Sequence, residues 1–374
     1  MYTTIQRFIT IFTLLIVTFT MHYSWASADS RVLMVVSSNG KDKGQTAPGY
    51  EFDEFAKAYL VFKANGIEVD IASPKGGAVE ADNYDPSADF NAPVLADQEI
   101  MQKLNETLPI STVNAAEYAG VFVVGGKGAM FDLPIDTALQ TLIADIYQQQ
   151  GVIAAVCHGP AALVHVKLAN GEYLVAGKTV NGFTNEEEQL FGKKWLAEFD
   201  FLLEDKLKAR GGKFAAAEIM LEYVAVDERL ITGQNPTSTV AAAEAMVAEL
   251  GLTPVAMPTF RDDYTLALVA DLLAGDKTAA IKLSQGSEQL HIELVGMYGY
   301  YFLNVAEDDK ELQQALTLMQ LGQSAINNPN LDIQIAKTQQ QLGDTVASTQ
   351  TLRNILDSHP DFTAAQELLT SITQ

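Results

Sequence analysis

The chain has 374 residues, 48% of them hydrophobic, which is enough to bury a sizeable core in about two domains. Its formal net charge is −23 at pH 7. This excess of carboxylates argues against nucleic acid and against anionic membrane surfaces as partners, because both repel an acidic protein.

The first 28 residues are typical of a signal peptide. Arg7 is the only charged residue among them, an apolar run follows at 8–19, and Ala26-Ser27-Ala28 fits a small-x-small cleavage site. The run is shorter than the roughly 20 residues that cross a bilayer as a helix. We therefore expect residues 1–28 to be cleaved on export, which leaves a periplasmic or secreted protein without a membrane segment. The alternative is an uncleaved N-terminal anchor.

Residues 31–71 have the pattern of one βαβ unit. Residues 31–37 form a short β-branched apolar run, residues 51–65 carry apolar side chains at helical spacing up to Gly66, and residues 67–71 alternate as a strand does. Such units imply a parallel sheet. The polar, proline-dotted stretch 72–115 is too long for a simple connection, and we expect it to be an insertion that covers one end of the sheet.

Further strands and helices of the same kind follow. We expect strands at 120–124 and 151–156 with a helix at 134–149 between them. A strand and turn at 179–184, a hairpin at 222–232 and a closing helix at 238–250 complete the pattern. Residues 29–250 are thus predicted to form an α/β domain with a flavodoxin-like parallel sheet flanked by helices.

The composition changes after residue 250. Residues 251–263 contain two prolines and are predicted to be a linker, and no strand pattern remains in residues 264–374. Asn328-Pro329 and His359-Pro360 lie 31 residues apart, so the segment weakly resembles tetratricopeptide repeats; an ordinary helical bundle is the alternative. Too few repeats are present for independent stability, so we expect this all-α extension to pack on something else, and a protein partner is one option.

Cys157 is the only cysteine of the chain, so no internal disulfide is available. The cysteine directly follows the buried strand and precedes Gly159-Pro160, which suits the first turn of a helix. This pattern predicts a nucleophile elbow at the carboxyl end of the sheet, where α/β sheets bind ligands. We expect an exposed, strained cysteine whose thiol pKa is lowered by the helix N-terminus.

Four motifs in register carry a family resemblance. They are AVCHGP at 155–160, VFVVGGKGAMFDLP at 121–134, NGFTNEEE at 181–188 and LITGQNP at 230–236. Together they resemble the ThiJ/PfpI superfamily, relatives of the class I glutamine amidotransferases, in its chaperone and glyoxalase III-like branch. The similarity covers roughly residues 31–250 and implies the class I glutamine amidotransferase-like fold.

The resemblance also implies a catalytic set. It consists of Cys157 as nucleophile, the adjacent His158, and a glutamate from the helix after the first strand, which alignment places at Glu54 with Glu51 as the alternative. The backbone N–H groups of Gly126 and His158 would form an oxyanion hole. The side chain of His158 can also be a structural residue that points away from the sulfur.

Two further residues are expected on the substrate side. Lys127 stands where the superfamily usually has histidine and adds a cation, and Phe183 belongs to the predicted strand and turn at 179–184. The five histidines show no metal-ligand spacing and the glycine-rich stretches lack phosphate-loop signatures. We therefore predict neither a metal nor another cofactor.

Three functions are compatible with this reading. The first is a glyoxalase III-like enzyme that converts small 2-oxoaldehydes to 2-hydroxy acids without glutathione. The second is a thiol hydrolase or amidase that uses the same nucleophile, and the third is a non-enzymatic stress chaperone or binding protein. The superfamily commonly dimerises, so a homodimer is expected as an option.

Overall fold

The computed structural model describes residues 31–373, in which a seven-stranded sheet has the order β3-β2-β1-β4-β5-β9-β8. All neighbouring strands run parallel except β8, which pairs antiparallel with β9 in the predicted hairpin. The predicted signal peptide lies outside the described residues. The strands are β1 Arg31–Val35, β2 Glu68–Ser73, β3 Leu108–Pro109, β4 Gly120–Val123, β5 Val152–Val156, β8 Val224–Asp227 and β9 Leu230–Gly233.

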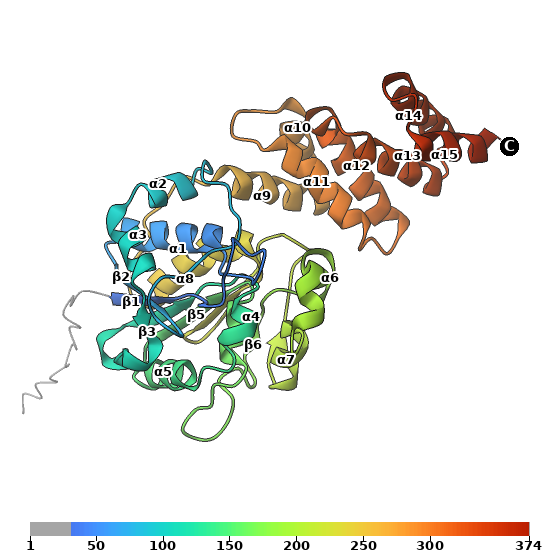
Figure 1. Cartoon of the computed structure of the whole chain (residues 1–374). Helices are drawn as coiled ribbons and strands as arrows, with labels where there is room; N and C mark the ends of the chain where they lie inside the picture. Colours follow the sequence, from blue (N-terminus) through green and yellow to red (C-terminus); the bar gives the residue numbers. More distant parts are fainter. Residues whose placement is uncertain (1–30, 374) are drawn as a thin grey trace, which may run out of the picture.

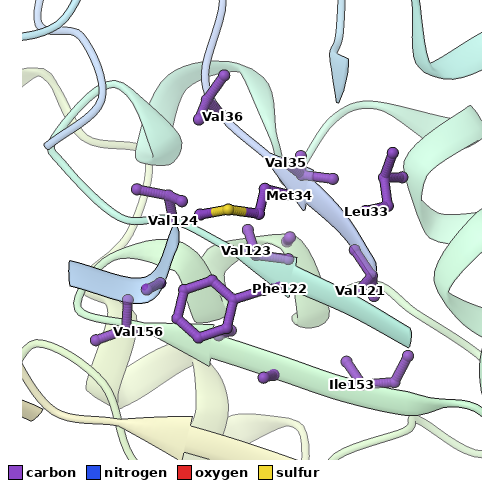
Figure 2. Close-up of a cluster of buried hydrophobic side chains, with 14 of the residues drawn as sticks. Leu33, Met34, Val35, Val36, Val121, Phe122, Val123, Val124, Ile153 and Val156 are labelled. Atoms are coloured by element: carbon purple, nitrogen blue, oxygen red, sulfur yellow. The ribbon is translucent and has the colours of Figure 1, made fainter. Parts of the chain in front are cut away.

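The three central strands are buried on both faces. Almost every side chain of β1, β4 and β5 is inaccessible to solvent, and Figure 2 shows their apolar side chains packed around Met34 and Phe122. Continuous apolar runs are typical of parallel strands covered on both faces. Helices α1 (Phe52–Ala64) and α8 (Thr239–Glu249) pack together over one face, and α5 (Thr137–Gln148) covers the other (Figure 1). The predicted α/β layer architecture is confirmed.

Two segments differ from the sequence prediction. Residues 72–115 are a crossover rather than a plain insertion: they carry α2 (Asn91–Leu95) and α3 (Gln98–Asn105) and end in β3, which extends the sheet beside β2. The strand predicted at 179–184 is only β6 (Thr179–Val180), which pairs with β7 (Lys213–Phe214) outside the main sheet. Both pairings join segments distant in sequence, so local periodicity does not reveal them. The remaining helices of this domain are α4 Ala129–Asp132, α6 Asn185–Phe191 and α7 Leu203–Ala209.

Residues 251–373, called the C-terminal segment below, contain only helices. They form an array that extends from the side of the sheet covered by α1 and α8 (Figure 1). Helix α9 begins at Arg261, inside the stretch expected to be a linker. The helices are α9 Arg261–Leu273, α10 Lys277–Gln285, α11 Ile292–Leu303, α12 Asp309–Ile326, α13 Pro329–Gln341, α14 Thr345–Ser358 and α15 Thr363–Thr373. No helix within residues 31–373 combines the length and apolar composition that a membrane crossing requires.

Candidate active site

Cys157 occupies a strained turn directly after β5. Its φ is +59°, a left-handed conformation that costs a non-glycine residue about 1–3 kcal/mol unless its surroundings impose it. Here the backbone N–H of Cys157 donates to the carbonyl of Gly233 on β9, and its own carbonyl accepts from the N–H of Phe183, both at 2.9 Å. These two bonds hold the turn, so the sharp backbone expected for a nucleophile elbow is present.

The helix expected after this turn is shorter and tighter than predicted. Residues Gly159–Leu163 form one 3₁₀ helix of five residues. The backbone of Gly159 packs against β4 so closely that an added Cβ would lie 2.4 Å from the carbonyl oxygen of Val123. A single 3₁₀ turn has little aligned dipole, so the helix N-terminus contributes less to thiolate stability than the sequence suggested.

The Cys157 side chain is buried, and the prediction of an exposed thiol was wrong. Only 4% of the residue is accessible, and it lines a cavity of about 300 Å³ whose other walls come from both parts of the chain. Gly126, Lys127, His158 and Phe183 also line this cavity. The structure therefore brings the predicted substrate-side residues to the same space as the cysteine.

The His158 ring lies beside the sulfur. Its Nδ1 is 3.4 Å from the Cys157 Sγ, and its Nε2 is 2.8 Å from Oε2 of Glu188 on α6. Both side chains of the His158–Glu188 pair are almost fully buried, and the Phe183 ring packs at a tilt against the imidazole with ring centroids 4.4 Å apart. Of the two orientations considered for His158, the structure has the one that can exchange a proton with the sulfur.

Glu188 is the residue that the sequence analysis missed. It belongs to a run of three glutamates in the first turn of α6, and the start of this helix is set by a capping box between Thr184 and Glu187. Glu187 and Glu188 are buried, although acidic residues are rarely buried without a partner. An acidic run within one of the four family motifs was the available signal, but the directions of its side chains depend on the cap.

Glu54 lies in the first turn of α1, behind the sulfur. Its Oε2 accepts a 2.7 Å hydrogen bond from the backbone N–H of Gly125, whereas Oε1 is buried and has no partner among the described residues. Burial, and then the nearby carboxylate of Glu51, raises the pKa of Glu54 well above its ordinary value. A neutral Glu54 has a proton on an oxygen that lacks any other partner and is free to donate it to the sulfur.

Glu51, the alternative to Glu54, lines the cavity instead of contacting Gly125 through its side chain. Burial, together with the neighbouring Asp53, raises its pKa to about 8. The two glutamates therefore occupy different positions, one behind the sulfur and the other in the cavity wall. The geometry favours Glu54 as the carboxyl that acts on Cys157.

The thiol itself is not in a simply activating environment. Burial, and then the carboxylate charge of Glu54, raises the pKa of the Cys157 thiol, while the backbone N–H of Gly126 opposes this by donating toward the sulfur. The predicted lowering of the thiol pKa is therefore not supported, because burial raises it whichever form Glu54 takes. When Glu54 is protonated, the repulsion is replaced by a donor, which removes one of the causes that raise the thiol pKa.

Gly126 has the backbone conformation required of a donor at the end of β4. Its φ is +90°, and an added Cβ would lie 2.4 Å from the backbone nitrogen of Glu51, so no other residue fits. Its N–H faces the sulfur, which is the position expected of one oxyanion-hole donor. Within residues 31–373, no three His, Cys, Asp or Glu side chains are grouped so that they could hold a metal ion.

Comparison with known proteins places this site in a family. Residues 45–249 match the DJ-1/PfpI family. The chain is 33% identical over 246 residues to the glutathione-independent glyoxalase hsp3101 of Schizosaccharomyces pombe, an alignment that covers 59% of this chain and 96% of the relative.

Two solved structures have the same fold in the matched part. The Rapid Encystment Protein 24 KDa of Francisella tularensis is 33% identical with a TM-score of 0.54, over 59% of this chain and 99% of that one. Glyoxalase III of Candida albicans is 26% identical with a TM-score of 0.54, over 59% of this chain and 97% of that one. Since the family match spans more than half of the residues, the chain belongs to the DJ-1/PfpI family.

Proposed function

We propose that this protein is a glutathione-independent glyoxalase, which converts a 2-oxoaldehyde and water into a 2-hydroxy acid. The observation that carries the proposal is that Cys157 and His158 line the same cavity, with the carboxyl of Glu54 beside the sulfur. The reaction needs a nucleophile and side chains that can carry protons, because a proton must move from one carbon of the substrate to the adjacent carbon. The relatives named as glutathione-independent glyoxalases support the same assignment.

The first step is addition of the thiolate to the aldehyde carbon. The Cys157 Sγ forms the new bond, the carbonyl π pair moves to oxygen, and that oxygen takes up a proton to give a hemithioacetal. The N–H of Gly126 is placed to stabilise the developing negative charge. That proton is the one the thiol gives up, and His158, whose Nδ1 lies 3.4 Å from Sγ, can carry it to the oxygen and so return to its neutral form, while Glu54 keeps its own proton beside the sulfur.

The second step moves a proton from the first carbon to the second. A base removes the hydrogen of the former aldehyde carbon, and a proton returns to the adjacent carbon, which turns the hemithioacetal into a 2-hydroxy thioester. His158 is suited to be this base, because Glu188 orients its ring through Nε2 and leaves Nδ1 toward the sulfur. Water then hydrolyses the thioester, which restores the thiol without net oxidation or reduction.

The test is turnover of methylglyoxal to lactate by the purified protein without glutathione. The Cys157→Ala variant should lose at least about a thousandfold in kcat, because Cys157 carries the only thiol of the chain. The matched control is Ser238→Ala, a buried hydroxyl outside the cavity lining. Lactate formation by Cys157→Ala at the wild-type rate contradicts the proposal.

Acyl transfer is the second candidate, and the Cys157–His158–Glu188 series favours it, because that order of groups also suits a thiol hydrolase. The two functions differ in the intermediate that accumulates. Mass spectrometry of the protein after mixing with ester and amide substrates should show an acyl adduct on Cys157 for a hydrolase. Absence of any adduct, together with lactate formation, supports the glyoxalase.

A further inference from the structure

The cavity above Cys157 has walls from two parts of the chain. Gly126, Cys157 and His158 line its inner end, and they belong to the residues matched by the family. Its outer wall includes Asp262, Asp263 and Leu266 of α9 and Leu294 of α11. These residues lie beyond position 249, where the family match ends, so this wall comes from the C-terminal segment.

The similar proteins leave no room for an equivalent wall. The alignments cover 96% of the Schizosaccharomyces pombe relative and 99% of the Francisella tularensis protein, but only 59% of this chain in each case. A helical segment of this length therefore has no counterpart in those two proteins. Any effect of the outer wall on substrate selectivity is therefore particular to chains that carry this segment.

The outer wall is held firmly against the α/β domain. Lys57 of α1 and Asp263 of α9 form a 2.6 Å ion pair, with side chains 4% and 11% exposed. Phe191 of α6 packs edge-on against Tyr301 of α11, with ring centroids 4.8 Å apart. A buried charge pair of this kind is costly to separate, so the wall behaves as part of the site rather than as a loose flap.

Apolar side chains from the α/β domain and the C-terminal segment face each other across the cavity. Those from the α/β domain are Phe90, Phe183, Phe191 and Met220, and those from the segment are Leu266 and Leu294. A volume of about 300 Å³ is at the lower end of the range for pockets that hold drug-sized ligands. A three-carbon oxoaldehyde fills only part of such a space, so the apolar outer half is left for a larger group.

The charged residues of the outer half do not offer a site for an anion. Lys57 is engaged by Asp263, and the carboxylate of Asp53 accepts a hydrogen bond from Asn91. Asp262 is paired with His291 at 2.7 Å. Lys127 also lines the cavity, but it follows Gly126 at the inner end. Because three carboxylates surround the outer half and Lys57 is already paired, a negatively charged side group that extends into this half is disfavoured.

We infer that helices α9 and α11 make the site selective for 2-oxoaldehydes whose side group is uncharged, apolar and larger than methyl, with Leu266 as the main specificity-determining residue. This inference rests on the proposed glyoxalase function and adds the substrate class to it. The reacting carbons bind beside Cys157, and the side group extends between Phe183 and Leu266. Removing contact area from such a wall lowers transition-state binding of the larger substrate only.

The experiment compares two substrates, methylglyoxal and 2-oxoheptanal, which has a pentyl group in place of methyl. For the wild-type full-length protein we expect kcat/KM for 2-oxoheptanal to exceed that for methylglyoxal by about tenfold or more. Leu266→Ala should lower kcat/KM for 2-oxoheptanal by about tenfold and change methylglyoxal turnover little. The readout is each 2-hydroxy acid, separated by chromatography.

The matched control is Leu268→Ala on the same helix. Leu266 and Leu268 are 5% and 4% exposed and belong to the same buried cluster, but only Leu266 lines the cavity. Leu268→Ala should therefore destabilise the segment similarly and leave the substrate ratio unchanged. If Leu266→Ala does not fold, Leu266→Phe provides the converse test, because it narrows the outer half and should reduce only 2-oxoheptanal turnover.

The outcomes separate this inference from the proposed function. Equal preference for the two aldehydes in the wild type, or the same change of ratio in the two leucine variants, overturns the inference and leaves the glyoxalase intact. Turnover of neither aldehyde overturns the proposed function and the inference together.

Discussion

The α/β domain and the C-terminal segment both line the cavity, but they position their residues by different means. Cys157 and Gly126 are held by backbone hydrogen bonds and positive φ values at the ends of strands. Leu266 and Leu294 are held by helix packing and by one ion pair. Backbone geometry allows little adjustment, whereas side-chain packing tolerates substitution. The reactive groups and the outer wall of the cavity can therefore change independently.

In the α/β domain, the largest effect is expected for substitution of Glu54. Glu54→Gln keeps a group that can accept from Gly125 but removes the proton that we assign to the carboxyl. We expect kcat for methylglyoxal to fall by about 10²–10⁴-fold, the usual contribution of a positioned acid or base. Steady-state kinetics measures this loss.

Glu51→Gln is the control for that experiment. Its carboxyl lies three residues earlier and lines the cavity rather than contacting Gly125 through its side chain. It should retain most of the activity. An equal loss in both variants would mean that the acidic environment as a whole, and not the proton on Glu54, supports turnover.

The next largest effect concerns the contact between the two regions. Asp263→Ala leaves the Lys57 ammonium buried without its partner, and we expect a loss of about 3 kcal/mol in the free energy of unfolding. The double variant Lys57→Met with Asp263→Leu removes both charges and should be close to the wild type. Urea denaturation measures all three proteins.

An exposed pair provides the comparison for this prediction. Arg31 and Glu68 form a 2.9 Å ion pair with side chains 39% and 55% exposed, and Glu68→Ala should cost about 0–1 kcal/mol. If Asp263→Ala costs no more than Glu68→Ala, the ion pair does not hold α9 in place, and the wall of the cavity is looser than the structure indicates.

Much of the α/β domain could be predicted from the sequence, because its strands are continuous apolar runs and its helices have a clear period. The turn at Cys157 could also be predicted, since Gly159 and Pro160 follow a buried strand directly. The edge strand β3 could not, because a two-residue strand has no period, and its pairing with β2 depends on the whole crossover.

The site was predicted less completely than the fold. Glu188 lies 30 residues from His158, and only the cap of α6 decides which two of three consecutive glutamates turn inward and which of these reaches the histidine. The cavity beside Cys157 is lined in part by α9 and α11, which no local pattern connects with the sheet edge. The repeat character of the C-terminal segment and the cleavage of residues 1–28 stay predictions.

A smaller effect is expected for Glu188. Glu188→Gln keeps a side chain of the same size but removes the charge that orients and stabilises the His158 imidazolium. We expect kcat to fall by about 10²-fold, with KM nearly unchanged. The adjacent, exposed Glu186→Gln is the control and should have no effect.

A second variant tests whether Glu188 acts through the histidine. In a double variant with His158→Asn, the loss should equal that of His158→Asn alone, because residues that act as a unit are not additive. Additive losses would assign Glu188 a separate role, such as holding α6 in place.

The last prediction concerns the pH dependence of stability. Burial raises the pKa of Glu51 to about 8 in the folded protein, from an ordinary value of 4.5. The folded state therefore binds this proton more tightly than the unfolded state, which stabilises the fold fully below pH 4.5. That contribution is lost as the pH rises toward about 8, so the melting temperature of the wild type should decline across this window relative to Glu51→Gln.

Thermal unfolding at pH 5 and pH 8 measures the difference between the wild type and Glu51→Gln. Glu106→Gln, a substitution at an exposed residue, is the control and should follow the wild type. A constant offset between Glu51→Gln and the wild type at both pH values would show that Glu51 titrates as an ordinary surface carboxyl, and that the cavity wall beside it is hydrated rather than closed by the C-terminal segment.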